Sequence, residues 1–132
     1  MTALGREIHS RSDIEALRRE ASALARTLGA SEPVAGEAAL IVSELGTNLL
    51  RYARHGSLAI TTERSDARAG IRFESRDQGP GIADVGLALT PGYSSGGGLG
   101  QGLPMVERLA GGKIDLTTSN EGTTIVVVKW LS

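Results

Sequence analysis

The chain contains no cysteine, which excludes disulfide bonds and thiolate metal sites. Its two histidines, His9 and His55, are too few for a histidine-rich zinc site. Aromatic residues make up only 3% of the sequence, so the core of the protein has to be aliphatic. These absences argue against a disulfide-stabilised scaffold and against a zinc site.

The sequence also lacks a strong charge and a long apolar run. Its formal net charge is −1 and its pI is about 6.1, so nothing in the charge favours nucleic acid or an anionic membrane as a partner. No apolar run reaches the length of about 18 residues that is typical of membrane-spanning helices. The first residues lack the apolar stretch of a signal peptide. We therefore expect a soluble, cytoplasmic protein.

Glycine, by contrast, is abundant and concentrated in one region. The sequence has 18 glycines, and residues 79–102 hold nine of them. Such a concentration is typical of backbone that moves or comes close to a ligand. A flexible linker is the alternative, but Leu99, Leu103 and Met105 continue the glycine run into a helical pattern.

The order of the predicted elements indicates one α+β domain over residues 1–132. We expect helices over 12–28, 31–54 and 99–110, a weak first strand at 5–10, and further strands over 57–64, 70–76, 113–119 and 123–131. Ser12 and Glu15 are expected to form the capping box of the first helix, and Ser31 to cap the second. This order predicts a two-layer sandwich, in which one mixed, mostly antiparallel sheet carries three main helices on one face. The last strand is rich in β-branched residues and is expected near the centre of the sheet.

Glu44, Asn48 and Arg51 follow one stripe of the second predicted helix, within an arc of roughly 60° at about 100° per residue. The apolar residues expected to pack on the sheet project to the other side: Ala38, Val42, Leu45, Leu49 and Ala53. Buried polar groups cost about 1–3 kcal/mol each when unpaired, and a metal ion with phosphates would satisfy all three side chains. A few solvated polar residues are the alternative, and for the triplet alone they are the better interpretation. Gly46, in the middle of this helix, is unfavourable there unless it permits close helix packing.

The common phosphate-binding motifs are absent. Lys113 follows a glycine but precedes Ile114, so the chain has no Walker A motif. The glycine run at 96–102 does not fit the G-x-G-x-x-G pattern of dinucleotide-binding folds. Protein-kinase signatures are missing as well.

Four short motifs together resemble another nucleotide-binding family. They are E-L-G-T-N at 44–48, D-Q-G-P-G-I at 77–82, G-L-G-Q-G-L at 98–103 and G-T-T at 122–124. Their order and spacing resemble the Bergerat-fold ATPases of the GHKL superfamily. The whole chain is most similar to the RsbT-like serine/threonine-protein kinases of the anti-sigma regulatory factor family. Any one motif is weak, whereas four in register over about 80 residues are specific.

The resemblance implies an adenine pocket at the end of the second hairpin strand. Asp77 would accept a hydrogen bond from the adenine amino group, and Thr123 would complete the pocket. Gly79 and Gly81 would let the backbone pass close to the base, and Ile82 would line its apolar side. Each has a plainer alternative: a strand-end acid, an ordinary Pro-Gly turn and a surface threonine.

The resemblance also implies a phosphate and magnesium site. Asn48 would bind Mg²⁺, Glu44 would act as general base or orient the attacking hydroxyl, and Arg51 would approach a phosphate or form an ion pair. The nucleotide-binding residues implied in the glycine run are Gly98, Leu99, Gly100, Gly102 and Leu103. The glycines would turn backbone N–H groups toward the phosphates, next to the positive end of the following helix.

By resemblance, the protein would be an ATP- and Mg²⁺-dependent serine/threonine kinase of a bacterial partner-switching (stressosome-type) module. Its substrate would be a STAS-domain protein, and it would dock on a downstream regulator such as a PP2C phosphatase. One departure is the lid segment 93–99, which holds no Lys or Arg where relatives often carry one. An anti-sigma-type module that binds ATP or ADP with little kinase turnover is therefore the alternative. A histidine-kinase catalytic domain is a third hypothesis, weakened by the short lid and by the lack of a phosphoacceptor helix.

Overall fold

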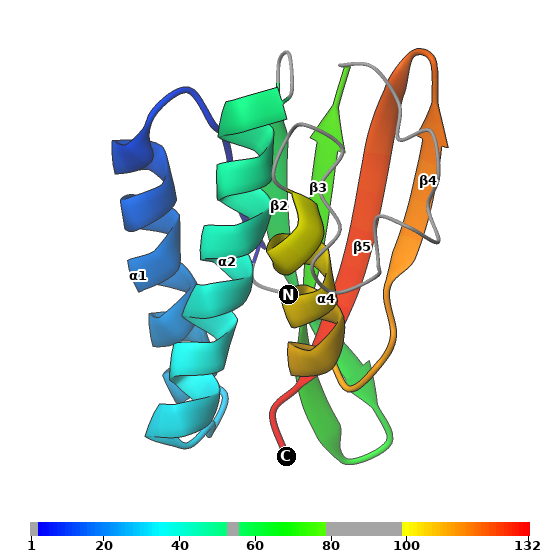
Figure 1. Ribbon diagram of the computed structural model, residues 1–132. Coiled ribbons are helices and arrows are strands. Elements are labelled where there is room, and N and C mark those ends of the chain that lie inside the picture. Colours follow the sequence, from blue (N-terminus) through cyan, green and yellow to red (C-terminus); the bar gives the residue numbers. More distant parts are fainter. Residues whose placement is uncertain (1–2, 53–55, 79–98) are drawn as a thin grey trace.

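The computed structural model describes residues 3–52, 56–78 and 99–132. The elements are β1 (Ala3–Glu7), α1 (Arg11–Thr27), α2 (Glu32–Tyr52), β2 (Ser57–Ser65), β3 (Arg68–Asp77), α4 (Leu99–Leu109), β4 (Asp115–Ser119) and β5 (Gly122–Trp130). Figure 1 shows two layers, with α1, α2 and α4 side by side on one face of the sheet. The predicted α+β sandwich is confirmed.

The five-stranded sheet has the order β1-β2-β3-β5-β4. Every pairing between the described strands is antiparallel, so the parallel pairing allowed for in a mixed sheet does not occur among them. The central strand is β3, and β5 lies directly beside it, so the prediction that the last strand lies near the centre is confirmed. Val126 and Val128 of β5 are nevertheless only half-buried and lie on the face opposite the helices. The β-branched run of β5 therefore does not indicate burial on both faces.

Helix α1 begins at Arg11, and its cap differs from the prediction. Ser10 is the N-cap residue, in an extended conformation. The Asp13 carboxylate accepts hydrogen bonds from the backbone N–H groups of His9 at 2.9 Å and Ser10 at 3.1 Å. These bonds, that from His9 above all, hold the pKa of Asp13 below its ordinary value. The predicted pair Ser12 and Glu15 is wrong, because Asp13 is the residue three positions after the cap.

Helix α2 begins as predicted, since the Val34 N–H group donates a hydrogen bond to Ser31 Oγ at 3.3 Å. The apolar face predicted for this helix is also confirmed: Ala38, Val42, Leu45 and Leu49 are all buried. Ala53 lies outside the described residues. The core is aliphatic apart from Phe73 of β3, its largest fully buried side chain. This burial fixes the rotation of α2 about its axis, and with it the direction of the polar stripe.

Gly46 lies where α2 packs against α1. A Cβ atom added at this position would stand 2.9 Å from Ile14 Cγ1, a distance that real side chains do not tolerate. The close approach of the two helices therefore accounts for a glycine in the middle of α2.

A pair of glycine-to-alanine substitutions on α2 tests this packing. Gly36 is exposed, with no atom within 4 Å of an added Cβ, so Gly36→Ala is expected to stabilise the protein by about 0.5–1 kcal/mol. Gly46→Ala gains the same helix propensity but overpacks against Ile14, so it should be less stable than Gly36→Ala by about 1–3 kcal/mol. Urea denaturation of both variants measures the difference. Equal gains in the two variants would show that the helices are not in tight contact.

Candidate functional site

Several polar and glycine-rich segments meet at one end of the molecule. The last residues of β3, the first residues of β5, the C-terminal half of α2 and the start of α4 all lie toward this end (Figure 1). Asp77 ends β3, and Thr123 is its direct partner on β5. Side chains alternate along a strand, so Asp77 shares the helix-covered face with Ser75 and Phe73, which are buried. The sheet thus brings Asp77 and Thr123 together, as the resemblance implied.

Thr123 is buried, with 6% of its surface exposed. Its hydroxyl lies 2.9 Å from the hydroxyl of Thr118 on β4, and the two groups form a hydrogen bond. The alternative of a surface threonine is therefore wrong. The hydroxyl pair joins β4 and β5 directly beside the end of β3.

Gly122 is a site residue that the sequence did not single out beyond its motif. Its φ angle is +155°, and an added Cβ would collide with the backbone carbonyl of Asp77. Only glycine allows the start of β5 to come this close to the end of β3. Gly122 therefore sets the position of Asp77, and the motif G-T-T at 122–124 was the available signal.

The residues of the polar stripe of α2 differ in their exposure to solvent. Glu44 and Asn48 are half-buried, whereas Arg51 is exposed in the last turn. Asn48 Nδ2 is inaccessible to solvent and has no hydrogen-bond partner among the residues that the structure describes. Glu44 makes no ion pair with another residue of the described chain. A buried polar atom that lacks a protein partner is commonly satisfied by a bound ligand. The half-buried Asn48 amide is therefore a candidate ligand-binding group.

The start of α4 contributes backbone donors. Gly100 and Gly102 lie in the first turn of this helix, which begins at Leu99. The first four N–H groups of a helix have no partner within it and carry its positive end, so they suit phosphate oxygens. Leu103 is fully buried in the hydrophobic core, and its side chain anchors the helix. Gly79, Gly81, Ile82 and Gly98 lie outside the described residues.

The side chains at this site can hold a magnesium ion only when phosphates supply most of the ligands of the ion. Among the described residues there is no group of three or more His, Asp or Glu side chains that could hold a metal. Mg²⁺ is commonly bound through one or two protein oxygens together with substrate phosphates. The Asn48 amide, with one buried atom unsatisfied, provides a place for such an oxygen once the amide is turned over.

Comparison with known protein families identifies the family of this chain. Residues 10–129 match the histidine kinase-like ATPase domain family. The chain belongs to this family. It is 35% identical over 119 residues to the serine/threonine-protein kinase RsbT of Bacillus subtilis (strain 168), and the match covers 90% of each chain. Within the family, it is an RsbT-like serine/threonine-protein kinase, which confirms the resemblance drawn from the four motifs.

Solved structures share the fold of the family. The RsbU and RsbW domains of Rv1364c from Mycobacterium tuberculosis match with a TM-score of 0.66 and 17% identity, over 98% of this chain and 32% of that chain. The mycobacterial sensor histidine kinase MprB matches with a TM-score of 0.60 and 15% identity, over 98% of this chain and 97% of that chain. At these identities the likeness shows the fold alone, so it gives no support to the histidine-kinase hypothesis.

Family membership makes ATP the expected nucleotide. None of the helices in the described ranges has the length and hydropathy needed to cross a membrane.

Proposed function

We propose that this chain is a single kinase domain, residues 1–132, of a bacterial partner-switching module in the cytoplasm. It transfers the γ-phosphoryl group of ATP to a serine or threonine of a STAS-domain protein, and it docks on a downstream regulator such as a PP2C-type phosphatase. The observation that carries the proposal is the similarity to RsbT over 90% of both chains. The convergence of four separate segments at one end of the fold supports it.

The adenine end of the nucleotide is assigned to β3 and β5. The Asp77 carboxylate accepts a hydrogen bond from the adenine amino group, beside the buried Thr123 hydroxyl. Asp77 is half-buried and lies on the helix-covered face, so such a bond would be partly shielded from water. Gly122 fixes the strand end that carries this carboxylate. Gly79, Gly81 and Ile82 complete the adenine pocket in the proposal.

The phosphate end is assigned to α2 and α4. Backbone N–H groups of Gly98, Leu99, Gly100 and Gly102 bind phosphate oxygens, with Leu103 holding the helix in the core. Asn48 holds Mg²⁺ through its amide oxygen, which removes the cost of its unpaired buried amide. The ion would neutralise phosphate charge. The exposed Arg51 is available to a phosphate at the rim.

Glu44 lies one helical turn before Asn48, on the same stripe of α2. In the proposed reaction its carboxylate accepts the proton of the substrate hydroxyl as that oxygen bonds to the γ-phosphorus. The bond from the γ-phosphorus to the bridging oxygen breaks, and ADP leaves. The chain contributes positioning and charge stabilisation and no covalent intermediate.

The experiment that tests the proposal uses a purified STAS-domain protein from the same organism as the candidate substrate. Incubation with radiolabelled ATP and Mg²⁺ should label that protein on a serine or threonine, and omission of Mg²⁺ should stop the transfer. Partner binding and nucleotide binding without label transfer would favour the alternative, an interaction module with little turnover. The absence of Lys and Arg from 93–99 is the observation behind that alternative, because a cation near the γ-phosphate stabilises the transition state.

A further inference from the structure

Half of strand β5 has no neighbour on one side within the described chain. Strand β4 pairs only with residues 122–126 of β5, from Ser119 opposite Gly122 to Asp115 opposite Val126. Residues 127–130 continue past the beginning of β4 along an open edge. Unpaired strand edges are sites where another extended chain can add.

The backbone groups that face this open edge can be identified. The Leu131 N–H group donates to the Ala69 carbonyl at 3.0 Å, which continues the β3–β5 pairing. Successive residues of an antiparallel strand direct their N–H and C=O groups to opposite sides. Val127 and Lys129 therefore face β3, whereas Val128 and Trp130 direct their donors and acceptors outward. The described chain provides no backbone partner for these groups.

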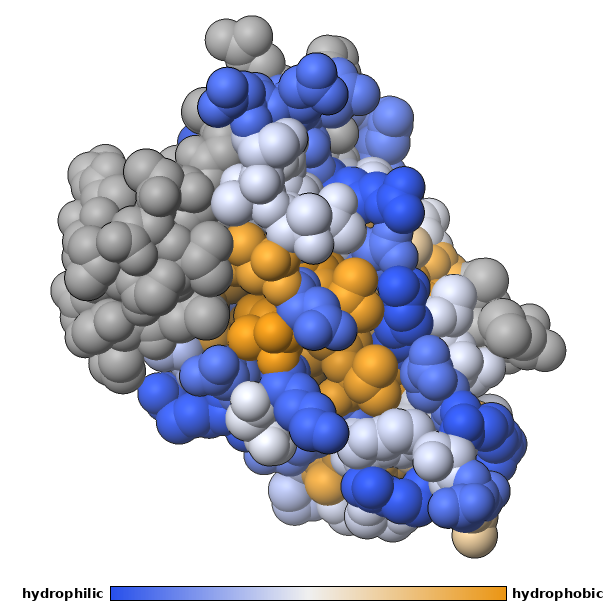
Figure 2. Space-filling view, turned by 90° about the vertical axis from the view of Figure 1, so that its right-hand side faces the viewer, coloured by the Kyte–Doolittle hydropathy of each residue, from blue (hydrophilic) through white to orange (hydrophobic). Residues whose placement is uncertain are grey.

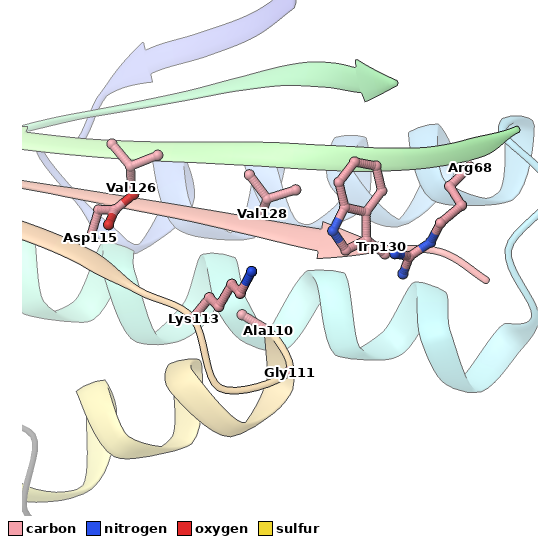
Figure 3. A pocket seen from close by; sticks show the side chains of 8 residues that line it. All are labelled: Arg68, Ala110, Gly111, Lys113, Asp115, Val126, Val128 and Trp130. Atoms are coloured by element: carbon pink, nitrogen blue, oxygen red, sulfur yellow. The ribbon is translucent and has the colours of Figure 1, made fainter. Parts of the chain in front are cut away.

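A cavity of about 480 Å³ lies along this edge, between the end of α4 and the outer side chains of β5 (Figure 3). Val128 and Trp130 form its apolar side. Figure 2, which looks onto this side of the molecule, shows a hydrophobic area with hydrophilic residues to its right and below it. We call the surface formed by Arg68, Lys113, Val128 and Trp130 the β5 edge groove.

The positive charge of the groove favours an acidic occupant. Lys113 is exposed, has no ion pair in the described ranges, and extends its ammonium group into the cavity (Figure 3). The Arg68 guanidinium lies 4.7 Å from the Trp130 ring centre at the other end and donates one hydrogen bond, at 3.4 Å, to the Ser132 backbone oxygen, so its remaining N–H groups are the ones that can meet a ligand. Asp115 is the one acid in the lining, and Figure 3 shows it beside Val126, away from both cations.

The charges that β3 carries on the same sheet face do not cancel this excess, and Glu63 of β2 is separated from Trp130 by the intervening strand at Gly70. Arg72, Glu74 and Arg76 lie beside the outer residues of β5. Glu74 is paired with both arginines, at 2.7 Å to Arg72, and the Arg72 hydrogen bond above all holds the pKa of Glu74 below its ordinary value. One carboxylate between two guanidinium groups leaves this cluster positive.

We propose that the β5 edge groove binds an extended acidic segment of a partner protein. The segment adds as a short strand beside residues 127–130, exchanges backbone hydrogen bonds with Val128 and Trp130, and places a carboxylate between Lys113 and Arg68. Trp130 stands seven residues along β5 from Thr123, roughly 23 Å at 3.3 Å per residue. The groove is thus separate from the proposed nucleotide site, and the inference does not depend on the proposed function.

Trp130 is the only tryptophan of the chain, so its fluorescence reports on the groove directly. The probe is a capped peptide, Thr-Glu-Val-Glu-Thr-Glu, titrated into the full chain. We expect a saturable change in Trp130 emission at micromolar peptide, together with shifts of the Val128 and Trp130 amide signals in NMR spectra. Lys113→Glu should weaken binding at least tenfold. Arg19→Glu, a charge reversal at an exposed position of α1, should leave it unchanged.

Two further peptides separate charge from backbone pairing. A version with Lys in place of Glu should not bind, and a version methylated at alternate backbone nitrogens should lose at least tenfold in affinity. Equal binding of either version, or an unchanged affinity in Lys113→Glu, would overturn the proposal. Self-association of the chain that protects the Val128 amide would also overturn it, because the occupant would then be a second copy. Nucleotide binding by Lys113→Glu, measured alongside, should match the unsubstituted chain.

Discussion

Asp77→Asn is expected to weaken binding of a non-hydrolysable ATP analogue by roughly 10- to 150-fold. The carboxylate is proposed to accept a charge-assisted hydrogen bond from adenine, and such bonds are worth about 1.5–3 kcal/mol. The side chain is half-buried at the end of β3, directly opposite Thr123, so water compensates only partly for its loss. Isothermal titration calorimetry in the presence of Mg²⁺ measures the change.

Asp66→Asn is the matched control for this substitution. Asp66 is exposed in the β2–β3 turn with a φ angle of +53°, a conformation that asparagine tolerates well. Its substitution should leave both nucleotide affinity and thermal stability unchanged. Unaltered affinity in Asp77→Asn would remove Asp77 from the adenine site, provided that both variants melt at the temperature of the parent.

Glu44→Ala is expected to reduce phosphoryl transfer to the partner by about 10²–10⁴-fold, the range typical of a lost general base. Nucleotide affinity should stay within about twofold, because the proposed role of Glu44 is toward the acceptor hydroxyl and not toward the nucleotide. Single-turnover transfer of radiolabel to the STAS-domain protein measures the rate, and calorimetry measures the affinity.

Glu37→Ala provides a control on the same helix. Glu37 is partly exposed in the N-terminal half of α2 and forms a 3.0 Å ion pair with Lys129, whose side chain is only 14% exposed, so a melting curve has to accompany this control. Removal of the Glu37 carboxylate should leave the transfer rate unchanged. Undiminished transfer in Glu44→Ala would refute the assignment of the base, and loss of nucleotide binding in that variant would assign Glu44 a binding role instead.

The buried and exposed faces of the helices were predictable from the sequence, because they follow from the spacing of residues within each helix. Val42, Leu45 and Leu49 are buried, and the polar stripe carrying Glu44 and Asn48 points away from them, as the 3.6-residue spacing predicted. The cap of α1 was predicted two residues too late. Ser12 and Glu15 have the spacing of a capping box, but the hydrogen bonds that the Asp13 carboxylate accepts from the backbone place the cap at Ser10 instead.

Strand order was less predictable, since it depends on pairings between distant segments. The β-branched run of β5 predicted a place near the sheet's centre, and β5 does lie beside the central strand β3, but Val126 and Val128 lie on a half-exposed face of the sheet. Composition cannot distinguish burial on both faces from an apolar outer face.

The candidate site was predictable only through the family resemblance. No periodicity relates Asp77 to Thr123, and their contact follows from the register between β3 and β5. The need for glycine at 122 is set by the Asp77 carbonyl on another strand, so it became visible only in the fold. The burial of the Asn48 Nδ2 atom, which meets no partner within residues 3–52, 56–78 and 99–132, likewise depends on how the helices pack.

A crystal structure grown with Mg²⁺ and a non-hydrolysable ATP analogue would locate the nucleotide on the molecule. We expect adenine density against Asp77 and Thr123, phosphates at the first turn of α4, and a Mg²⁺ ion on the Asn48 amide oxygen. Nucleotide density elsewhere on the molecule, or crystals in which the analogue stays unbound at saturating concentration, would contradict the proposed nucleotide site.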